Sequence, residues 1–549
     1  MVQSPPPSPE NGLSAPALSL TVHSGGHLHR LEIPPGTSVR DALDATDLRV
    51  RAACGGTGTC GACTVRLLGG AVNPFTLAEY QKLSPSEREQ GLRLACQLRP
   101  QGDITIRIDD PAPPSPWKSI PPENLVPVSG GQPELAQHIY GVAVDLGTTH
   151  IRVALWDRKR GRRIATRRGA NPQGDFGADV LNRLDAALAS PQRARELAAL
   201  ARAAIVQAVR DMLARDVGEV TPMLAEIGQV LIVANTAMLA LLSGRGGAEL
   251  MNPDNWQTAI DCRPSDETAW REQWRLPHAR IALPAPVAGF IGSDLLASLL
   301  ATHLTEGAPG SMLLDIGTNT EIALWDGERL LLTSVPGGPA FEGVGIRHGM
   351  PAENGAIYRI QPTASGFDCA VIGGGEARGV CGSGLVDGVA VLLQNGVLKP
   401  SGRFATPPGG EGFVLLPGNP RSTLTSGDVD AFQRAKAATA AAMAELLHQA
   451  GMDWRGLRRL CVCGAFGRHL DIGHAQAVGL LPALEQGGIE LVADATLAGC
   501  EAGLLGPDGE AVFAQLTNLA CPINLSFIEG YDDRYIDHLR LKPLFSPVN

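Results

Sequence analysis

The amino-acid sequence predicts a multidomain fold, in which a small β-rich domain is followed by a large α/β domain built from two related lobes. Three features predict this arrangement. They are a glycine-rich loop with closely spaced cysteines around Cys60, a proline-rich segment at 109–138, and a motif that occurs twice in the rest of the chain. A chain of 549 residues is long enough for several domains, each with a sizeable core.

Composition and charge restrict the classes of function. With 44% apolar residues and a net charge of −10, the chain gives no reason to expect nucleic acid or an anionic membrane as a partner. The polar, proline-rich start lacks the apolar core of a secretory signal, and the apolar stretch 281–302 is interrupted by prolines and Asp294. Eleven cysteines without a secretory signal favour a reducing compartment. We therefore expect a cytoplasmic protein that binds neither nucleic acid nor membrane, with a disordered tail at 1–16.

The first domain carries a cysteine pattern suited to an iron–sulfur cluster. Strands are predicted at 18–24 and 28–33, and a helix begins after Ser38. In the loop that follows, the spacing is C-x5-C-x2-C, with a fourth cysteine in the later segment LRLACQL. The four predicted ligands of a 2Fe-2S cluster are Cys54, Cys60, Cys63 and Cys96. The glycines let the loop curl around the sulfurs and donate N–H groups to them. Zinc is the competing metal, but a zinc site usually needs a second C-x2-C or histidine pair, which this loop lacks.

Residues 17–108 resemble plant-type ferredoxins, which implies a β-grasp fold. The first cysteine spacing is five residues instead of the plant-type four, as in ferredoxin modules attached to larger redox proteins. The segment 109–138 follows with eight prolines. This composition predicts an extended linker that could reach on the order of 90 Å, at about 3.1 Å per residue. We expect such a linker to let the ferredoxin domain swing between partners.

The repeated motif reads VAVDLGTTHIRVALWD at 142–157 and MLLDIGTNTEIALWD at 312–326. Each copy is an apolar strand that ends at an aspartate, Asp145 or Asp315, and then turns. The turn residues that could meet an anion are Gly147, Thr148, Thr149, Gly317, Thr318 and Asn319. Two such hairpins facing each other would clamp a triphosphate, with the two aspartates holding Mg²⁺. The alternative is an ordinary β-hairpin with a Gly-Thr turn.

Other motifs lie in the same α/β region. Asn235-Thr236 ends a strand or caps a helix, and Glu342 lies in a long glycine-rich loop. Gly382, Ser383 and Gly384 precede a helix, where free N–H groups favour an anion. The strand LCVC runs into Gly464, Ala465 and Gly467, a turn that leaves room for a flat base. Cys461 and Cys463 fit core packing, His469 and His474 have no companions at metal-ligand spacing, and 245–280 has no clear pattern.

These motifs resemble the actin/Hsp70/sugar-kinase superfamily, which implies a two-lobed α/β ATPase domain over 139–549, with lobe I at about 139–305 and lobe II at about 310–545. In that resemblance, DLGTT and DIGTN are the phosphate motifs, GAFG at 464–467 is the adenosine motif and CGSG at 381–384 is a connecting segment. The implied ligands are ATP and Mg²⁺, with Asp145 and Asp315 as catalytic residues.

The ferredoxin domain narrows the resemblance to reductive activators of corrinoid enzymes. The phrases that carry it are DIGTNTE (315–321), GGPAFEG (337–343), CGSG, AKAA (435–438) and GAFG. It implies ATP-dependent reduction of Co(II) corrinoid to Co(I) through the 2Fe-2S cluster, which keeps a corrinoid-dependent methyltransferase active. The expected partners are the corrinoid protein and an external electron donor such as a ferredoxin, flavoprotein or reductase; a homodimer is left open. The segment 109–138 is too short for the extra middle domain that some members carry.

Two other functions are consistent with the same motifs. The chain could be an ATP-driven electron donor to another low-potential enzyme, such as an acyl-CoA dehydratase or reductase. Those activators usually hold a bridging cluster with few cysteines per subunit, whereas this sequence offers four. The alternative outside enzymes is an actin-like binding protein with a redox sensor. Nucleotide turnover stimulated by a corrinoid protein would separate them.

Overall fold

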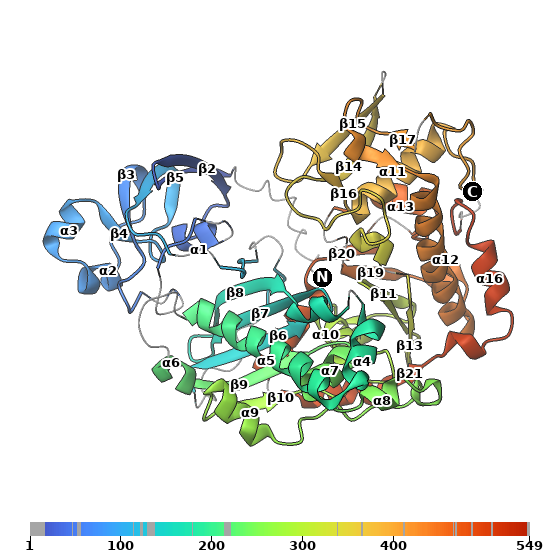
Figure 1. Cartoon of the computed structure of the whole chain (residues 1–549), viewed down its shortest axis with the longest axis horizontal. Helices are drawn as coiled ribbons and strands as arrows, with labels where there is room; N and C mark the ends of the chain where they lie inside the picture. Colours follow the sequence, from blue (N-terminus) through green and yellow to red (C-terminus); the bar gives the residue numbers. More distant parts are fainter. Residues whose placement is uncertain are drawn as a thin grey trace, which may run out of the picture.

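The computed structural model describes residues 17–545 with short gaps (Figure 1). The gaps are 45, 47, 52–55, 57, 113–114, 121–124, 129–137, 178, 214–220, 338, 364–365, 410–411, 465, 467–468, 485–486 and 507–508. The predicted tail at 1–16 and the predicted ligand Cys54 therefore lie outside the described residues. None of the helices within the described ranges is long and apolar enough to cross a membrane.

The N-terminal domain is a five-stranded sheet with short helices packed on it, drawn in blue in Figure 1. In order across the sheet, the strands are β2 (His27–Ile33), β1 (Leu18–Ser24), β5 (Pro100–Ile108), β3 (Thr64–Val72) and β4 (Leu92–Leu94). The helices are α1 (Val39–Asp44), α2 (Leu77–Lys82) and α3 (Pro85–Glu89). The predicted strands form a hairpin that turns at Gly25-Gly26, and Ser38 caps α1, which begins after Ser38 as predicted. Alternate residues of β1 and β5 fill the core.

Lobe I has a mixed sheet with helices on both sides. The strands, in order, are β10 (Arg280–Ala282), β9 (Ile227–Val233), β6 (Tyr140–Leu146), β7 (His150–Asp157) and β8 (Arg162–Ala170). The helical segments are η3 (Pro172–Phe176), α4 (Val180–Ala189), α5 (Pro191–Leu213), α6 (Thr221–Ala225), α7 (Thr236–Ser243), α8 (Gly247–Leu250), η4 (Pro253–Asn255), α9 (Glu267–Trp274), α10 (Ser293–Ala301) and η5 (Leu304–Glu306). The amphipathic helix α5 packs its apolar side into the lobe I core.

Lobe II repeats this plan with a six-stranded sheet. In order, its strands are β20 (Ile489–Val492), β19 (Arg459–Gly464), β11 (Ser311–Ile316), β12 (Thr320–Trp325), β13 (Leu330–Val335) and β21 (Ala520–Pro522). Smaller sheets contain β15 (Gly366–Val371), β14 (Ala356–Thr363) and β16 (Gly379–Val380), and β17 (Phe413–Val414) with β18 (Thr423–Leu424). The helical segments are η6 (Pro339–Glu342), α11 (Gly382–Gln394), η7 (Pro420–Ser422), α12 (Ser426–Gln449), η8 (Trp454–Gly456), α13 (Ile472–Ala477), α14 (Ala495–Leu505), α15 (Ala511–Leu519), η9 (Leu525–Phe527) and α16 (Tyr531–Asp537).

The sequence repeat is a structural repeat. β6 pairs antiparallel with β7 and parallel with β9, and β11 pairs in the same way with β12 and β19. In each copy the aspartate lies near the end of a buried strand whose next turn leads into the antiparallel partner. The two-lobed actin-like fold predicted from the repeat is therefore confirmed. Helix α14 packs on α10 and on β6 and β9, so it lies between the two sheets.

The predicted linker does not hang free where it is described. Trp117 and Ile120 are buried in the cores of the large domain, and Lys118 forms backbone hydrogen bonds with Arg168 on β8. The expectation of a loose arm was therefore wrong for residues 115–120. A proline-rich composition predicts an extended backbone, and here that extended backbone lies along the edge strand β8 instead of projecting into solvent.

Candidate functional site

The two Asp-x-Gly-Thr turns line one cavity between the lobes. Asp145 and Asp315 both face it, together with the turn residues predicted from the repeat. Thr148 Oγ1 accepts a hydrogen bond of 3.1 Å from the amide of Asn235, which also caps α7. Both alternatives for Asn235, a polar site residue and a helix cap, therefore hold. The geometry is that of two opposed hairpins, with backbone N–H groups at both turns.

The cavity is strongly acidic. The carboxyl groups that line it are those of Asp145, Asp294, Asp315, Glu321, Glu342 and Asp494. The guanidinium of Arg152, on β7, lies opposite them: its Nη1 donates to Asp145 Oδ2 at 2.9 Å, and its Nε lies 3.0 Å from Asp494 Oδ1. His150 lies half-buried beside it, and desolvation together with Arg152 lowers the pKa of His150 to about 4. At neutral pH this histidine adds no positive charge.

The second aspartate is held by hydroxyl groups instead of a cation. Ser298 on α10 donates to Asp315 Oδ2 at 2.7 Å, and Thr496 on α14 donates to the same oxygen at 3.4 Å. Thr318 donates to Glu342 Oε2 at 2.8 Å, so the loop residue singled out in the sequence does reach the site. Helices from both lobes thus fix one carboxylate, and movement of the lobes would change its surroundings.

Burial and crowding of like charges raise the pKa values of these carboxyl groups. Burial, opposed by Arg152, raises the pKa of Asp145 to about 6. Burial and the nearby Asp315 raise that of Asp294 to about 8. Burial also raises the pKa of Glu321, with a further contribution from Asp294. Carboxyl groups crowded in this way are characteristic of sites that bind cations or move protons.

Several members of the site were not predicted. Arg152, Asp294, Glu321 and Asp494 all line the cavity. Arg152 and Glu321 carry a signal within the repeat itself, because each is a charged residue inside a buried hairpin strand and lies directly opposite the motif aspartate in register. Asp294 lies at the start of α10 and could have been found as a carboxyl group at a helix N-terminus. Asp494 has no comparable signal.

The glycine motifs separate into two groups. Gly464 lines the cavity, whereas Ala465 and Gly467 lie outside the described residues. Gly382 and Gly384 are buried where α11 meets other backbone, since a Cβ on them would lie 2.1 Å from the carbonyl oxygens of Phe341 and Ile357. Ser383 is buried too. These residues do not line the cavity with the two turns, and the two glycines allow close packing of α11. The assignment of the CGSG motif to the nucleotide stays a prediction.

The expectation that His474 has no companions was also wrong. Its Nδ1 lies 2.9 Å from Asp387 Oδ1, and Asp471 is close enough to complete a potential metal-binding group. Arg359 forms ion pairs with both carboxylates. The group therefore serves as an ion-pair cluster joining β14, α11 and α13. Cys461 and Cys463 are buried in β19, as predicted.

Three of the four predicted cluster ligands can be placed. The thiols of Cys63 and Cys96 are hydrogen-bonded to each other, and this contact together with burial raises the pKa of Cys63. Cys60 Sγ accepts the N–H of Ala62 at 3.4 Å, and Cys96 Sγ accepts the amide of Gln97 at the same distance. Paired sulfurs that also accept N–H groups suit an iron–sulfur cluster, whose binding would remove the thiol protons.

Comparisons with known proteins agree with this organisation. Residues 22–101 match the 2Fe-2S iron-sulfur cluster binding domain, residues 140–307 match the RACo middle region, and residues 310–545 match the C-terminal domain of RACo, the ASKHA domain. The match to the middle region thus falls on lobe I itself and not on an additional domain.

Named relatives and a solved structure are similar over most of the chain. The corrinoid activation enzyme RamQ of Eubacterium limosum is 27% identical over 436 residues, which cover 72% of this chain and 70% of RamQ. The reductase of the Co(II) methylated amine-specific corrinoid protein from Methanosarcina barkeri is 27% identical over 380 residues, 63% of this chain and 66% of the relative. The solved reductive activator for corrinoid, iron-sulfur protein has a TM-score of 0.63 at 23% identity, covers 96% of this chain, and supports the fold.

Fold and site therefore define an iron–sulfur protein with an ASKHA-type nucleotide-binding domain. More specifically, the three matches follow one another along the chain as a 2Fe-2S domain, the RACo middle region and the RACo C-terminal domain. The chain therefore has the domain organisation of RACo, and it resembles the corrinoid activation enzyme RamQ over 72% of its length.

Proposed function

We propose that this protein reduces the Co(II) form of a corrinoid protein to Co(I), using electrons from its ferredoxin domain and ATP bound between its lobes. The observation that carries the proposal is the convergence of both Asp-x-Gly-Thr turns in one cavity of a chain that also pairs cluster-type cysteines. The relatives named for corrinoid activation and corrinoid protein reduction support the substrate. The reduced corrinoid protein would keep a corrinoid-dependent methyltransferase active.

The cavity explains why the nucleotide should enter with a divalent cation. The carboxyl groups of the cavity that are ionised would repel a bare triphosphate, and Arg152 alone cannot offset them. Asp145 and Asp315 would hold Mg²⁺, directly or through water, and the cation would neutralise the phosphate oxygens. Backbone N–H groups of the turns at Gly147–Thr149 and Gly317–Asn319 would meet the phosphates. Asp294 lines the same cavity, and its pKa of about 8 leaves its carboxyl group largely protonated at neutral pH.

The ferredoxin domain supplies the electron. A 2Fe-2S cluster held by Cys54, Cys60, Cys63 and Cys96 would deliver single electrons at a potential near about −400 mV. One electron converts Co(II) to Co(I), so one cluster oxidation balances one cobalt reduction. Since the corrinoid is harder to reduce than such a cluster, closure of the lobes around ATP must favour the transfer. An external donor would then reduce the cluster again.

The catalytic assignment is tested by replacing the two motif aspartates. Asp145→Asn and Asp315→Asn should each lower MgATP hydrolysis by at least about a hundredfold, because each removes a charge that meets the nucleotide. Asp326→Asn, at the far end of the second repeat, is the matched control, because Asp326 pairs with Arg329 and does not line the cavity. Wild-type hydrolysis by both motif variants would refute the clamp.

The redox assignment is tested separately. The purified protein should be brown, with iron and a visible spectrum typical of a 2Fe-2S cluster, and Cys96→Ser should lose or alter that spectrum. Absorbance at the Co(II) band of an added corrinoid protein should fall only when ATP and a reductant are both present. Equal loss of Co(II) without ATP would overturn the coupling of hydrolysis to reduction.

A further inference from the structure

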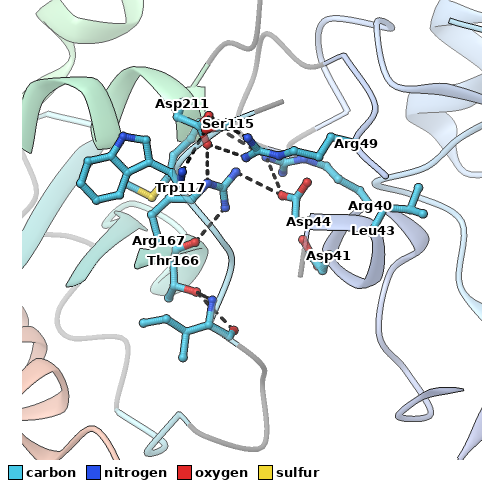
Figure 2. A network of polar contacts seen from close by, with 12 residues as sticks. Arg40, Asp41, Leu43, Asp44, Arg49, Ser115, Trp117, Thr166, Arg167 and Asp211 are labelled. Atoms are coloured by element: carbon cyan, nitrogen blue, oxygen red, sulfur yellow. Dashed lines mark hydrogen bonds and ion pairs between the residues drawn. The ribbon is translucent and has the colours of Figure 1, made fainter. Parts of the chain in front are cut away.

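The ferredoxin domain is joined to lobe I by a buried network of ion pairs (Figure 2). Arg49 donates two hydrogen bonds to Asp211 on α5, at 3.1 and 2.7 Å. Arg167 on β8 donates to the same carboxylate at 2.6 Å and to Asp44 on α1 at 3.1 Å. Ser115, from the linker, donates to Asp211 at 2.7 Å. Three parts of the chain thus meet at one carboxylate.

This network specifies one relative position of the two domains. Asp44, Arg49 and Arg167 are each no more than 1% exposed. A buried charge is costly unless its partners are in place, so a small shift would leave charges unpaired. The domains therefore have a defined docked state rather than a continuum of loose contacts.

Arg40 places a fixed charge between the cluster loop and lobe I. Its Nη2 donates to the carbonyl oxygen of Met212 on α5 at 3.5 Å and lies 3.8 Å from Asp44. On the other side it touches the cluster loop: a Cβ on Gly56 would lie 2.2 Å from Arg40 Nη1. The side chain is 1% exposed, and within the described part of the chain its Nε has no hydrogen-bond partner.

The docked cluster loop also faces a cavity rich in positive charge. This cavity, of about 220 Å³, is bounded by Gly56, Cys96 and Gln97 of the ferredoxin domain and by Arg162 and Arg163 of β8. Arg40 and Arg99 line it as well, with Asp41 as the acidic residue. Arg163 is paired with Glu501, whereas Arg162 lines the same cavity as Cys96.

We propose that docking of the ferredoxin domain on lobe I is linked to reduction of its cluster, with Arg40 as the positioning residue that transmits the link. This inference rests on the proposed function, because it needs a bound 2Fe-2S cluster. Reduction adds one negative charge, which the buried guanidinium and the cationic cavity stabilise. The docked domain therefore has a higher midpoint potential, and by reciprocity the reduced domain docks more tightly.

The link gives the domain interface a role in the reaction. A reduced domain stays on lobe I and keeps its electron. Release from lobe I takes Arg162 and Arg163 away from the cluster and leaves Arg40 without its lobe I partner, the carbonyl oxygen of Met212. This lowers the midpoint potential and makes donation to a low-potential acceptor more favourable. An oxidised domain docks more weakly and is more accessible to an external donor.

The test is a redox titration of the full-length protein, followed by visible absorbance and electron paramagnetic resonance. Arg40→Gln should lower the reduced-to-oxidised ratio at a fixed potential at least about tenfold, which is about 59 mV for one electron. Asp211→Asn, which lies outside the ferredoxin domain and weakens docking, should shift the midpoint in the same direction. Arg40→Lys keeps the charge and should retain most of the wild-type value.

Matched controls use an exposed ion pair on α12. Arg434→Gln and Asp430→Asn make the same chemical changes far from the cluster and should leave the midpoint unchanged. An unchanged midpoint in both Arg40→Gln and Asp211→Asn would overturn the proposal. A shift in Arg40→Gln alone would also overturn it, because tuning would then be independent of docking. If the Arg40→Gln variant loses its iron, the midpoint potential of the Asp211→Asn variant decides the test.

A second measurement addresses reciprocity. Hydrogen exchange of peptides covering 205–213 and 39–44 should be slower in the reduced wild-type protein than in the oxidised one. Equal exchange would overturn the redox-linked docking. Absence of iron and of a visible spectrum in the wild type would instead refute the proposed function, so the two failures are distinguishable.

Discussion

Lys436 is a buried lysine in the middle of α12, where its ammonium group donates a hydrogen bond of 2.7 Å to the carbonyl oxygen of Arg540. Burial, with a contribution from Lys542, lowers its pKa to about 7. An unfolded chain keeps this proton up to about pH 10.4. Between those values the unfolded state binds more protons, so the free energy of unfolding should rise with pH, by up to about 1.4 kcal/mol per pH unit.

Urea unfolding measured from about pH 6 to about pH 9 checks this prediction. Lys436→Met keeps an unbranched side chain of similar length and should remove the contribution. Lys399→Met, at an exposed position, should leave the pH dependence as it is. The same slope in wild type and Lys436→Met would mean that Lys436 is charged in the folded protein.

At the residue scale, the sequence predicted the parts of the site that local pattern can encode. Asp145 and Asp315 follow from the repeat. A carboxylate at the end of an apolar strand is unusual, and here it occurs at the same place in both copies of the motif. Asp494 could not be found in this way, since its place beside Arg152 depends on how α14 crosses between the lobes. The packing role of the CGSG glycines was equally hidden, because the facing carbonyl groups belong to η6 and β14.

At the scale of elements, the crossing of α10 and α14 depends on one glycine. A Cβ on Gly499 of α14 would lie 1.7 Å from the carbonyl oxygen of Ala297 on α10. Gly499→Ala should therefore push the helices apart and lower the free energy of unfolding by about 1–3 kcal/mol. Thermal unfolding followed by circular dichroism measures this, with Gly409→Ala as control, because a Cβ there meets nothing within 4 Å.

The same substitution should affect the nucleotide site. α10 carries Ser298 and α14 carries Thr496, and both donate to Asp315. A wider crossing would separate these hydroxyl groups, so MgATP hydrolysis should fall in Gly499→Ala and not in Gly409→Ala. Unchanged stability and hydrolysis in Gly499→Ala would mean that the crossing adjusts without cost.

Most regular elements were predictable, and the exceptions have physical reasons. The hairpins, α5 and α12 follow from period and composition, and Thr425 caps α12. Residues 245–280 showed no pattern because their helices are short and their order comes from tertiary packing. Trp270 and Trp274 of α9 stack on each other and are buried in the lobe I core. Such contacts leave no periodic signal.

At the scale of the whole molecule, the linker and the interface changed the expected picture. Proline content predicted reach, but it could not predict that Trp117 would lie against β8. There a Cβ on Gly169 would come within 2.6 Å of the indole, so the glycine makes room for it. The ion pairs around Asp211 join residues more than 40 positions apart, and pairings at that separation are invisible to composition.

This attachment leads to a prediction for the complete reaction. Trp117→Ala removes a buried indole next to Ser115, which itself donates to Asp211, and should loosen both the linker and the docked ferredoxin domain. Loss of a buried tryptophan costs about 3–5 kcal/mol where the site cannot collapse, and here much of that cost should fall on docking. The cluster spectrum and basal MgATP hydrolysis should persist, because neither set of ligands is touched.

The rate of cobalt reduction should rise in this variant, because the released domain has the lower midpoint potential. The measurement is single-turnover loss of Co(II), followed by stopped-flow absorbance with a pre-reduced cluster and saturating ATP, and it should be faster than in wild type. Trp454→Ala in lobe II is the matched control and should leave the rate unchanged. A slower rate in Trp117→Ala would mean that the electron leaves from the docked position, and the release step would have to be abandoned.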